Sequence, residues 1–250
     1  MIKKILLTLS SIVVVSAFAA DKNLPSYSEV KTSLTKIVAQ KNGGFGLNMW
    51  ATIVDRDGVV KVVAFSGSDR GAQWPGSRVI SAQKANTANA FSLPGLALST
   101  ANLFTATQPG GSLFGLQFSN PVDTSVAYGG KSSNIGTKKD PMLGKKIGGV
   151  NVFGGGLALY TKDGTLIGAL GVSGDSSCAD HNIAWKLRKT LGLDYVPAGV
   201  STTSDDNIVN DIDNGTSAGG WGHPACSEAA TKIAKDFPKT YSISKKINSR

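Results

Sequence analysis

Two short motifs in the second half of the chain carry the residues best suited to metal or redox chemistry. The first is Cys178-Ala-Asp-His181, and the second is the mirrored order His223-Pro-Ala-Cys226. Two thiolates and two imidazoles at this spacing can hold Zn²⁺ tetrahedrally, so these four residues form a candidate metal site. The chain has only 2 Cys, and in an oxidising compartment Cys178 and Cys226 would form a disulfide instead. We favour the disulfide, which would tie an irregular tail to the rest of the chain.

The N-terminus indicates the compartment. Residues 1–4 are positively charged, residues 5–18 are mostly apolar, and Ala17-Phe18-Ala19 matches a cleavage signal, a pattern typical of a secretory signal peptide. A transmembrane anchor is the alternative, but the apolar stretch is shorter than the roughly 20 residues that span a bilayer. We therefore expect residues 1–19 to be removed and the mature protein to be periplasmic or secreted, with no membrane span.

Composition and charge narrow the class of protein further. Of the 250 residues, 41% are hydrophobic and 17% are charged, which predicts a folded protein with a buried core. A net charge of +9 attracts nucleic acid, anionic lipid or small anions alike. Export argues against nucleic acid as a partner. Much of the charge lies in one loop, which we expect to be solvated, at Lys131, Lys138, Lys139, Lys145 and Lys146.

The hydrophobic pattern predicts one α+β domain with an antiparallel sheet. Apolar residues at three- and four-residue steps indicate helices, and β-rich runs joined by Asp-Gly turns indicate hairpins. Helices are expected over 26–40, from 77 to 91, over 96–107, from 177 to about 192 and over 227–237; the hairpins over 47–65 and 150–172; and a weak strand within 113–128. Residues 20–194 would form the domain, and 195–250 a C-terminal extension packed on it.

Three stretches of this chain resemble the GlcG/HbpS family of haem-binding and haem-degrading proteins, whose relatives include the C-terminal domain of PduO. They are VDRDGVVKVVAFSGSDRGA from Val54, SAQKANTANAF from Ser81, and GGGLALYTKDGTLIGALGVSGDSSCADHNIAW from Gly154. The resemblance implies a profilin-like fold, with about five antiparallel strands, helices on the faces of the sheet and an irregular C-terminal tail. It also implies a homo-oligomer and haem as the cofactor. Because the chain has no C-x-x-C-H motif, any haem would be bound non-covalently.

The resemblance suggests several ligand-binding residues, each with a structural alternative. Lys84 can pair with a haem propionate and Thr87 can offer an oxygen to the iron or to a bound water, although a Thr on an Ala-rich helix is more often a packing residue. Arg70 and Trp74 can clamp and stack on a planar anionic ligand, or belong to an ordinary surface loop. The best-supported function is an exported haem-binding protein that sequesters haem and degrades it or captures its iron. The alternative is an enzyme or auxiliary factor acting on a small organic acid or a corrinoid-type cofactor.

His181 and His223 are the candidate axial ligands, because an imidazole is a common protein ligand of haem iron. The alternative for both is a hydrogen-bonded structural histidine. Four acidic residues lie close together in the tail without the spacing of an EF-hand, at Asp205, Asp206, Asp211 and Asp213.

Overall fold

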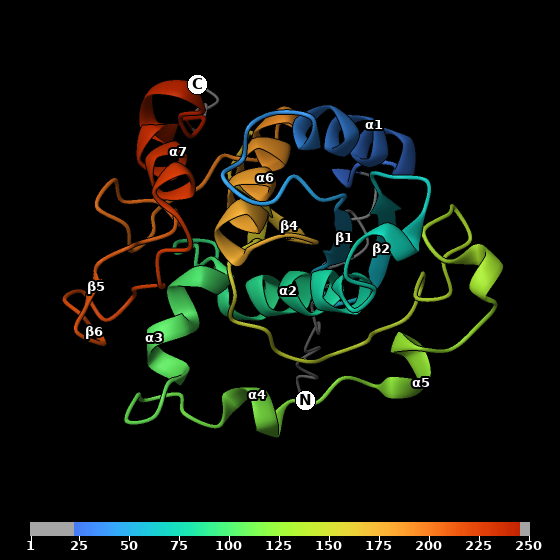
Figure 1. Ribbon diagram of the computed structural model, residues 1–250, viewed down its shortest axis with the longest axis horizontal. Coiled ribbons are helices and arrows are strands. Elements are labelled where there is room, and N and C mark those ends of the chain that lie inside the picture. Colours follow the sequence, from blue (N-terminus) through green and yellow to red (C-terminus); the bar gives the residue numbers. More distant parts are fainter. Residues whose placement is uncertain (1–22, 246–250) are drawn as a thin grey trace, which may run out of the picture.

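A computed structural model describes residues 23–245 of the chain, so the expected signal peptide lies outside the described residues. The fold alternates helices with two β-hairpins, as the sequence pattern predicts (Figure 1). In chain order the main elements are α1 Tyr27–Val38, β1 Trp50–Asp55, β2 Val60–Phe65, α2 Ser77–Phe91, α3 Phe104–Thr107, α4 Leu116–Ser119, α5 Thr124–Ala127, β3 Gly156–Tyr160, β4 Leu166–Ser173, α6 Ser177–Thr190, β5 Ile212–Asp213, β6 Thr216–Ser217 and α7 Glu228–Thr240.

The central sheet has four antiparallel strands in the order β2-β1-β4-β3, and the α+β class expected from the sequence is confirmed. Each hairpin turns at an Asp-Gly pair, where Gly58 and Gly164 adopt left-handed conformations with φ of 76° and 82° that are strained for other residues. The two hairpins join through β1 and β4, with Thr52 opposite Gly171. A separate two-stranded sheet, β5-β6, lies in the tail.

Helices cover both faces of the sheet (Figure 1). Helix α2 packs on one face, and α1 and α6 pack on the other. Helix α2 packs directly against the backbone of β4 because Gly171 has no side chain: a Cβ there would clash with the carbonyl of Ser81. Buried alanines on α2, including Ala82 and Ala85, permit the same approach. A sheet covered on both faces explains why every residue of β3 and β4 is buried.

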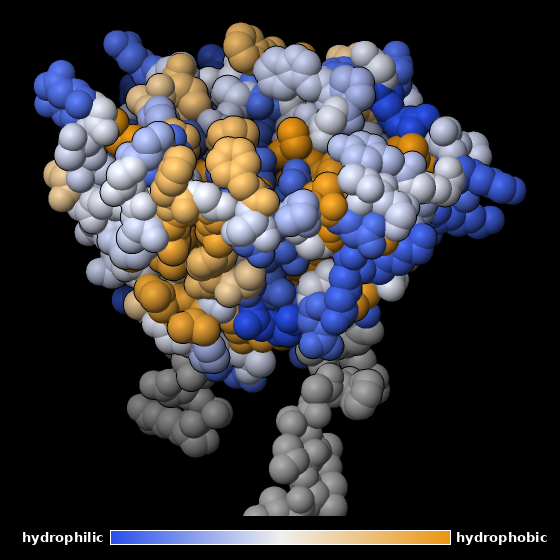
Figure 2. Space-filling view, turned by 90° about the horizontal axis from the view of Figure 1, so that it is seen from below, coloured by the Kyte–Doolittle hydropathy of each residue, from blue (hydrophilic) through white to orange (hydrophobic). Residues whose placement is uncertain are grey.

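The segment between α2 and β3 is less regular than its sequence pattern predicts. The helix expected over 96–107 is a 3₁₀ turn followed by the four-residue α3, and the weak strand expected within 113–128 is replaced by the short helices α4 and α5. An apolar area lies on the face formed by α3 and α4 (Figure 2), where Phe118 is 84% exposed. Within residues 23–245, no helix is long and apolar enough to cross a bilayer.

The C-terminal residues pack against α6. Phe237 of α7 stacks on Trp185 of α6, with ring centroids 5.4 Å apart. Trp185 also donates a hydrogen bond from its indole to the carbonyl of Tyr241. Because Trp185 and Phe237 are both in the largest hydrophobic cluster, the tail shares the core of the α+β domain.

Candidate functional site

A buried ion pair joins two of the segments that carry the family resemblance. Lys84 Nζ of α2 lies 2.6 Å from Asp180 Oδ2 in the first turn of α6, and both side chains are almost fully buried. Lys84 also donates to the carbonyl of Val172 at 3.1 Å. Burial raises the pKa of Asp180 to about 6 and lowers the pKa of Lys84, because each charge loses water. Lys84 is therefore a partner of Asp180 and does not reach the surface to meet a propionate.

Asp175 connects this ion pair to a surface loop. Its backbone N–H donates to Asp180 Oδ1 at 2.9 Å. Its carboxylate accepts hydrogen bonds from the backbone N–H groups of Phe45 and Leu47, at 2.9 and 3.1 Å. Gly44 allows this contact, because a Cβ at that position would overlap the Asp175 carboxylate. The loop before β1 is thus held at the N-terminus of α6.

A cavity of about 570 Å³ lies beside this loop, lined by Val38 and residues 40–47, by Asp175 and Ile183, and by Ala229, Lys232 and Ile233 of α7. We call it the 38–47 cavity. Most of its side chains are apolar, and Lys41 and Lys232 are the basic residues of the lining. Phe45 lies at its edge with 75% exposure. Its size falls within the roughly 300–1,000 Å³ range of small-molecule sites.

Thr87 and the glycines before β3 have structural contacts. Thr87 Oγ1 donates to the carbonyl of Gln83 at 2.8 Å and accepts from the Asn151 N–H at 3.0 Å. Cβ atoms at Gly154 and Gly155 would overlap the carbonyls of Ser177 and Val172. The glycines therefore allow the backbone before β3 to lie directly against the backbone of Val172 and Ser177, and Thr87 holds the segment that leads into them.

The two candidate histidines are buried in different hydrogen-bonding states. His181 Nε2 accepts from the Ile208 N–H at 3.0 Å, so its lone pair is occupied by the tail. His223 Nδ1 lies 2.8 Å from the carbonyl of Pro224, and its Nε2 has no partner among the described residues. Burial lowers the pKa of His181 to about 3 and that of His223 to about 4. Both imidazoles are neutral at pH 7, and each has one ring nitrogen without a hydrogen-bond partner among the described residues: Nδ1 of His181 and Nε2 of His223.

The expected disulfide is present. Cys178 in the first turn of α6 is bonded to Cys226, with Cα atoms 5.9 Å apart. Cys178 is buried, and Cys226 is exposed at the surface. The bond holds the start of α7 against the start of α6, next to the 38–47 cavity, where Ser227 donates to the carbonyl of Gly43 at 2.8 Å.

Arg70 and Trp74 lie in the loop before α2. Arg70 is in a short 3₁₀ turn that Asp69 caps. Trp74 is 52% exposed and meets Phe45 edge to face, with ring centroids 6.1 Å apart. The structure thus brings Trp74 to the edge of the 38–47 cavity through Phe45, whereas Lys84, Thr87, His181 and His223 lie in the interior.

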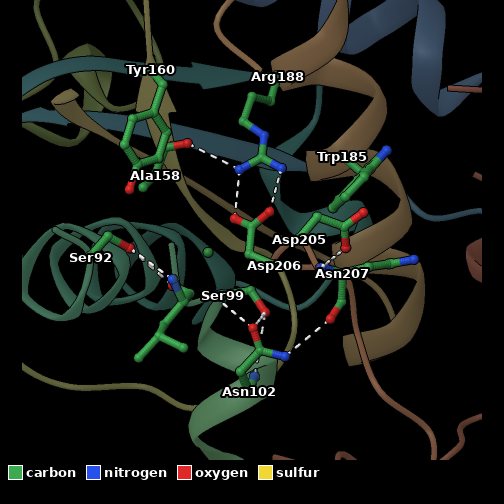
Figure 3. Close-up of polar contacts among 12 residues, drawn as sticks. Ser92, Ser99, Asn102, Ala158, Tyr160, Trp185, Arg188, Asp205, Asp206 and Asn207 are labelled. Atoms are coloured by element: carbon green, nitrogen blue, oxygen red, sulfur yellow. Dashed lines mark hydrogen bonds and ion pairs between the residues drawn. The ribbon is translucent and has the colours of Figure 1, made fainter. Parts of the chain in front are cut away.

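A second buried ion pair was not found by sequence reasoning. Arg188 at the end of α6 binds both carboxylate oxygens of Asp206, at 2.6 and 2.7 Å, and donates to the carbonyl of Ala158 (Figure 3). Both charged side chains have no exposed surface. Asp206 belongs to the acidic group in the tail, and its neighbour Asp205 accepts a hydrogen bond from Thr203 in a local turn. The only available signal was the acidic cluster, which did not indicate its partner.

A family model described as "Haem degrading protein HbpS-like" matches residues 28–188. The chain belongs to the HbpS-like family. The match includes the three stretches noted in the sequence, and it ends at Arg188. The tail residues that build one wall of the 38–47 cavity therefore lie outside the part that the family model describes.

Two solved structures are similar to this HbpS-like chain. One is the crystal structure of a PduOC–haem complex, 26% identical, which covers 65% of this chain and 89% of that chain with a TM-score of 0.44. The other is the Klebsiella pneumoniae protein ORFY of family DUF336, 22% identical, which covers 74% of this chain and 97% of that chain with a TM-score of 0.43. No curated protein matches the chain.

The lining of the 38–47 cavity has the chemistry that the periphery of a haem would need. Its apolar walls suit the macrocycle, and Lys41 and Lys232, both exposed at the surface, suit two propionates. Its lining contains no His, Cys, Met or Tyr, so it offers none of the usual axial ligands. Bound haem would supply an iron centre capable of redox chemistry, while the chain's own residues would hold the macrocycle.

Proposed function

We propose that this HbpS-like protein binds haem non-covalently in the 38–47 cavity and sequesters it. The observation that carries the proposal is the family match over residues 28–188, and the cavity supports it as the place of binding. Val38, Ile183 and Ile233 contribute apolar wall, and Lys41 and Lys232 would each pair with a carboxylate. Trp74 and Phe45 would cover the exposed edge of the ring.

The deciding experiment is a hemin titration of the oxidised protein, followed by the Soret absorbance and by quenching of tryptophan fluorescence. We expect saturable binding of one haem per chain. The variant Lys41→Glu/Lys232→Glu should weaken binding by about tenfold, because two weak ion pairs become repulsive contacts. The matched control is Lys131→Glu/Lys139→Glu, which changes the net charge equally on two exposed residues of another loop and should leave the affinity unchanged.

Other results would contradict specific parts of the proposal. An absence of saturable binding would exclude haem as the ligand. Equal losses in the cavity variant and in the control would mean that the lysines act only through net charge. His223→Gln should leave the affinity within about twofold, since His223 is not in the cavity lining; a tenfold loss would place the haem at His223 instead.

Export and haem turnover are further parts of this proposal. The disulfide is the structural feature that fits a periplasmic or secreted protein. Mass spectrometry of the protein isolated from cell fractions should find a mature N-terminus near Ala20. Incubating the haem complex with a reductant and oxygen tests degradation. Loss of the Soret band with release of iron supports turnover, and a stable band supports sequestration without degradation. A rise in melting temperature with a corrinoid and not with haem would favour the alternative cofactor.

We also infer that the protein is a homo-oligomer. Phe114 lies just before α4 and is 60% exposed, and Phe118 lies in α4 and is 84% exposed. The surrounding face is apolar (Figure 2). Exposed apolar areas of this kind mark contact surfaces. A second copy of the chain would cover these rings, and sedimentation velocity would measure the assembly.

A further inference from the structure

The atoms around the disulfide form a cluster that the proposed haem site does not use. The sulfurs of Cys178 and Cys226 and one imidazole nitrogen of His223 all lie within 4.8 Å of one another. His223 is 2% exposed, and its Nε2 has no hydrogen-bond partner among the described residues. A buried lone pair without a partner is costly, and here it belongs to a ring beside two sulfurs. We propose that reduction of the disulfide converts this cluster into a three-ligand site for Zn²⁺ or a similar divalent transition metal.

The hydrogen bond that His223 donates from Nδ1 orients its imidazole as in a metal-ligating histidine. Its Nδ1 contacts the carbonyl of Pro224, which can only accept, so the proton sits on Nδ1 and the lone pair on Nε2. Ligating histidines are commonly oriented by such a bond from the other ring nitrogen to a carbonyl. Ligation through Nε2 would satisfy the buried lone pair, and ligation through Nδ1 would replace the bond to Pro224. His181 is not part of the cluster of ligand atoms around the two sulfurs, and its Nε2 accepts a hydrogen bond from the Ile208 N–H.

The start of α6 favours the reduced, thiolate form at Cys226. Cys226 Sγ lies 3.2 Å from the backbone N–H of Cys178, in the first turn of this 14-residue helix. It also lies 3.4 Å from Ser177 Oγ. The N–H groups and positive end of a helix stabilise a thiolate. Two thiolates and one imidazole would leave one position of a tetrahedral metal open, and water can occupy such a position, as in catalytic zinc sites.

The chemistry balances with a dithiol reductant. A dithiol thiolate attacks the exposed sulfur of Cys226, the bond to Cys178 breaks, and Cys178 leaves as a thiolate that takes up a proton. The second thiol of the reductant then releases Cys226 and closes its own disulfide, so that two electrons pass to the protein. Binding of M²⁺ displaces one proton from each thiol, and the metal and the disulfide exclude each other.

Cobalt provides a direct probe that needs no haem. Haem-free protein is reduced with dithiothreitol, desalted under nitrogen and titrated with Co²⁺. We expect one Co²⁺ per chain, with visible d–d bands of tetrahedral geometry and near-ultraviolet thiolate charge transfer, which added Zn²⁺ abolishes. The oxidised protein should give no such bands. A reduced wild-type protein without these bands overturns the proposal, whatever the outcome of the hemin titration.

Two variants test the ligand assignments of Cys226 and His223, and a third variant serves as the control. Cys226→Ser changes an exposed residue and should lower the charge-transfer intensity and weaken Co²⁺ binding at least about tenfold. His223→Gln should weaken it similarly and alter the d–d bands. The matched control His181→Gln should retain the wild-type spectrum. An unchanged spectrum in His223→Gln or in Cys226→Ser overturns the three-ligand site, and near-ultraviolet circular dichroism verifies that each protein is folded.

Discussion

Reducing the disulfide between Cys178 and Cys226 should cost the protein much of its stability. The two cysteines are 48 residues apart in sequence, and the chain-entropy model gives about 4 kcal/mol at 25 °C for a loop of this length. For a chain of this size, that loss lowers the melting temperature by roughly 8–16 °C. The stabilisation arises mainly because the crosslink restricts the unfolded chain.

Urea unfolding with and without dithiothreitol measures this effect. A chelator must be present, so that no metal can replace the crosslink. Reduction leaves both sulfur atoms in place, so the measured difference belongs to the crosslink alone. The matched control is Cys178→Ala/Cys226→Ser, which should be less stable than the oxidised wild type by about 4 kcal/mol plus about 1 kcal/mol for the missing buried sulfur. Its unfolding curve should not respond to dithiothreitol.

The result could contradict this reasoning in two ways. A loss below about 1 kcal/mol would mean that the reduced, unfolded chain is already restricted near these residues. A new early transition, with the main one unchanged, would show that the tail unfolds separately and that the crosslink stabilises the tail alone. In that case a single free energy of unfolding does not describe the protein.

Three further predictions follow from buried groups and exposed rings. Asp206→Ala should destabilise the protein by about 3–5 kcal/mol because it leaves Arg188 buried without a partner, whereas adding Arg188→Leu should restore much of the loss in urea unfolding. His181 has a folded pKa of about 3, so its neutral burial stabilises the protein above its unfolded pKa of about 6.5, and this contribution should fall by roughly 1.4 kcal/mol per unit as the pH drops from 6.5 toward 3. The difference in stability between wild type and His181→Gln, measured against pH, isolates this effect, and a flat difference would contradict it. Phe118→Ser should shift sedimentation velocity toward smaller species without lowering the melting temperature of the folded chain; an unchanged distribution would exclude this face as the subunit contact.

The regular elements could be predicted from local patterns, and the irregular ones could not. Helix α1 follows its apolar stripe and a capping box at Ser26, and both hairpins follow their Asp-Gly turns. Between residues 96 and 128 the helices are only four residues long, too short to be stable without tertiary contacts. The secondary structure of this segment depends on tertiary packing, which a local sequence pattern does not reveal. The pairing of Cys178 with Cys226 was predictable because the chain offers no other cysteines.

The candidate site was less predictable than the fold. The resemblance points to Lys84 as a ligand residue, and the structure pairs its charge with Asp180, 96 residues away in the sequence. The 38–47 cavity combines a loop near the N-terminus with α7, and no motif connects these segments. Similarly, Arg78 anchors the lysine-rich loop by pairing with Asp140 at 2.5 Å. Charge partners at such separations follow from the completed fold, so their sequence positions give no signal.

The ion pair of Arg188 and Asp206 makes folding during synthesis depend on residues that lie beyond the family match. Arg188 is the last residue of the family match, and Asp206 follows 18 residues later. Until Asp206 has left the ribosome, the part that resembles other family members contains a buried cation without its counter-charge. A fragment designed to end at the family boundary should therefore aggregate or stay partly unfolded. A stable fragment of this protein needs to extend at least through Asp206, and through α7 to keep Phe237 stacked on Trp185.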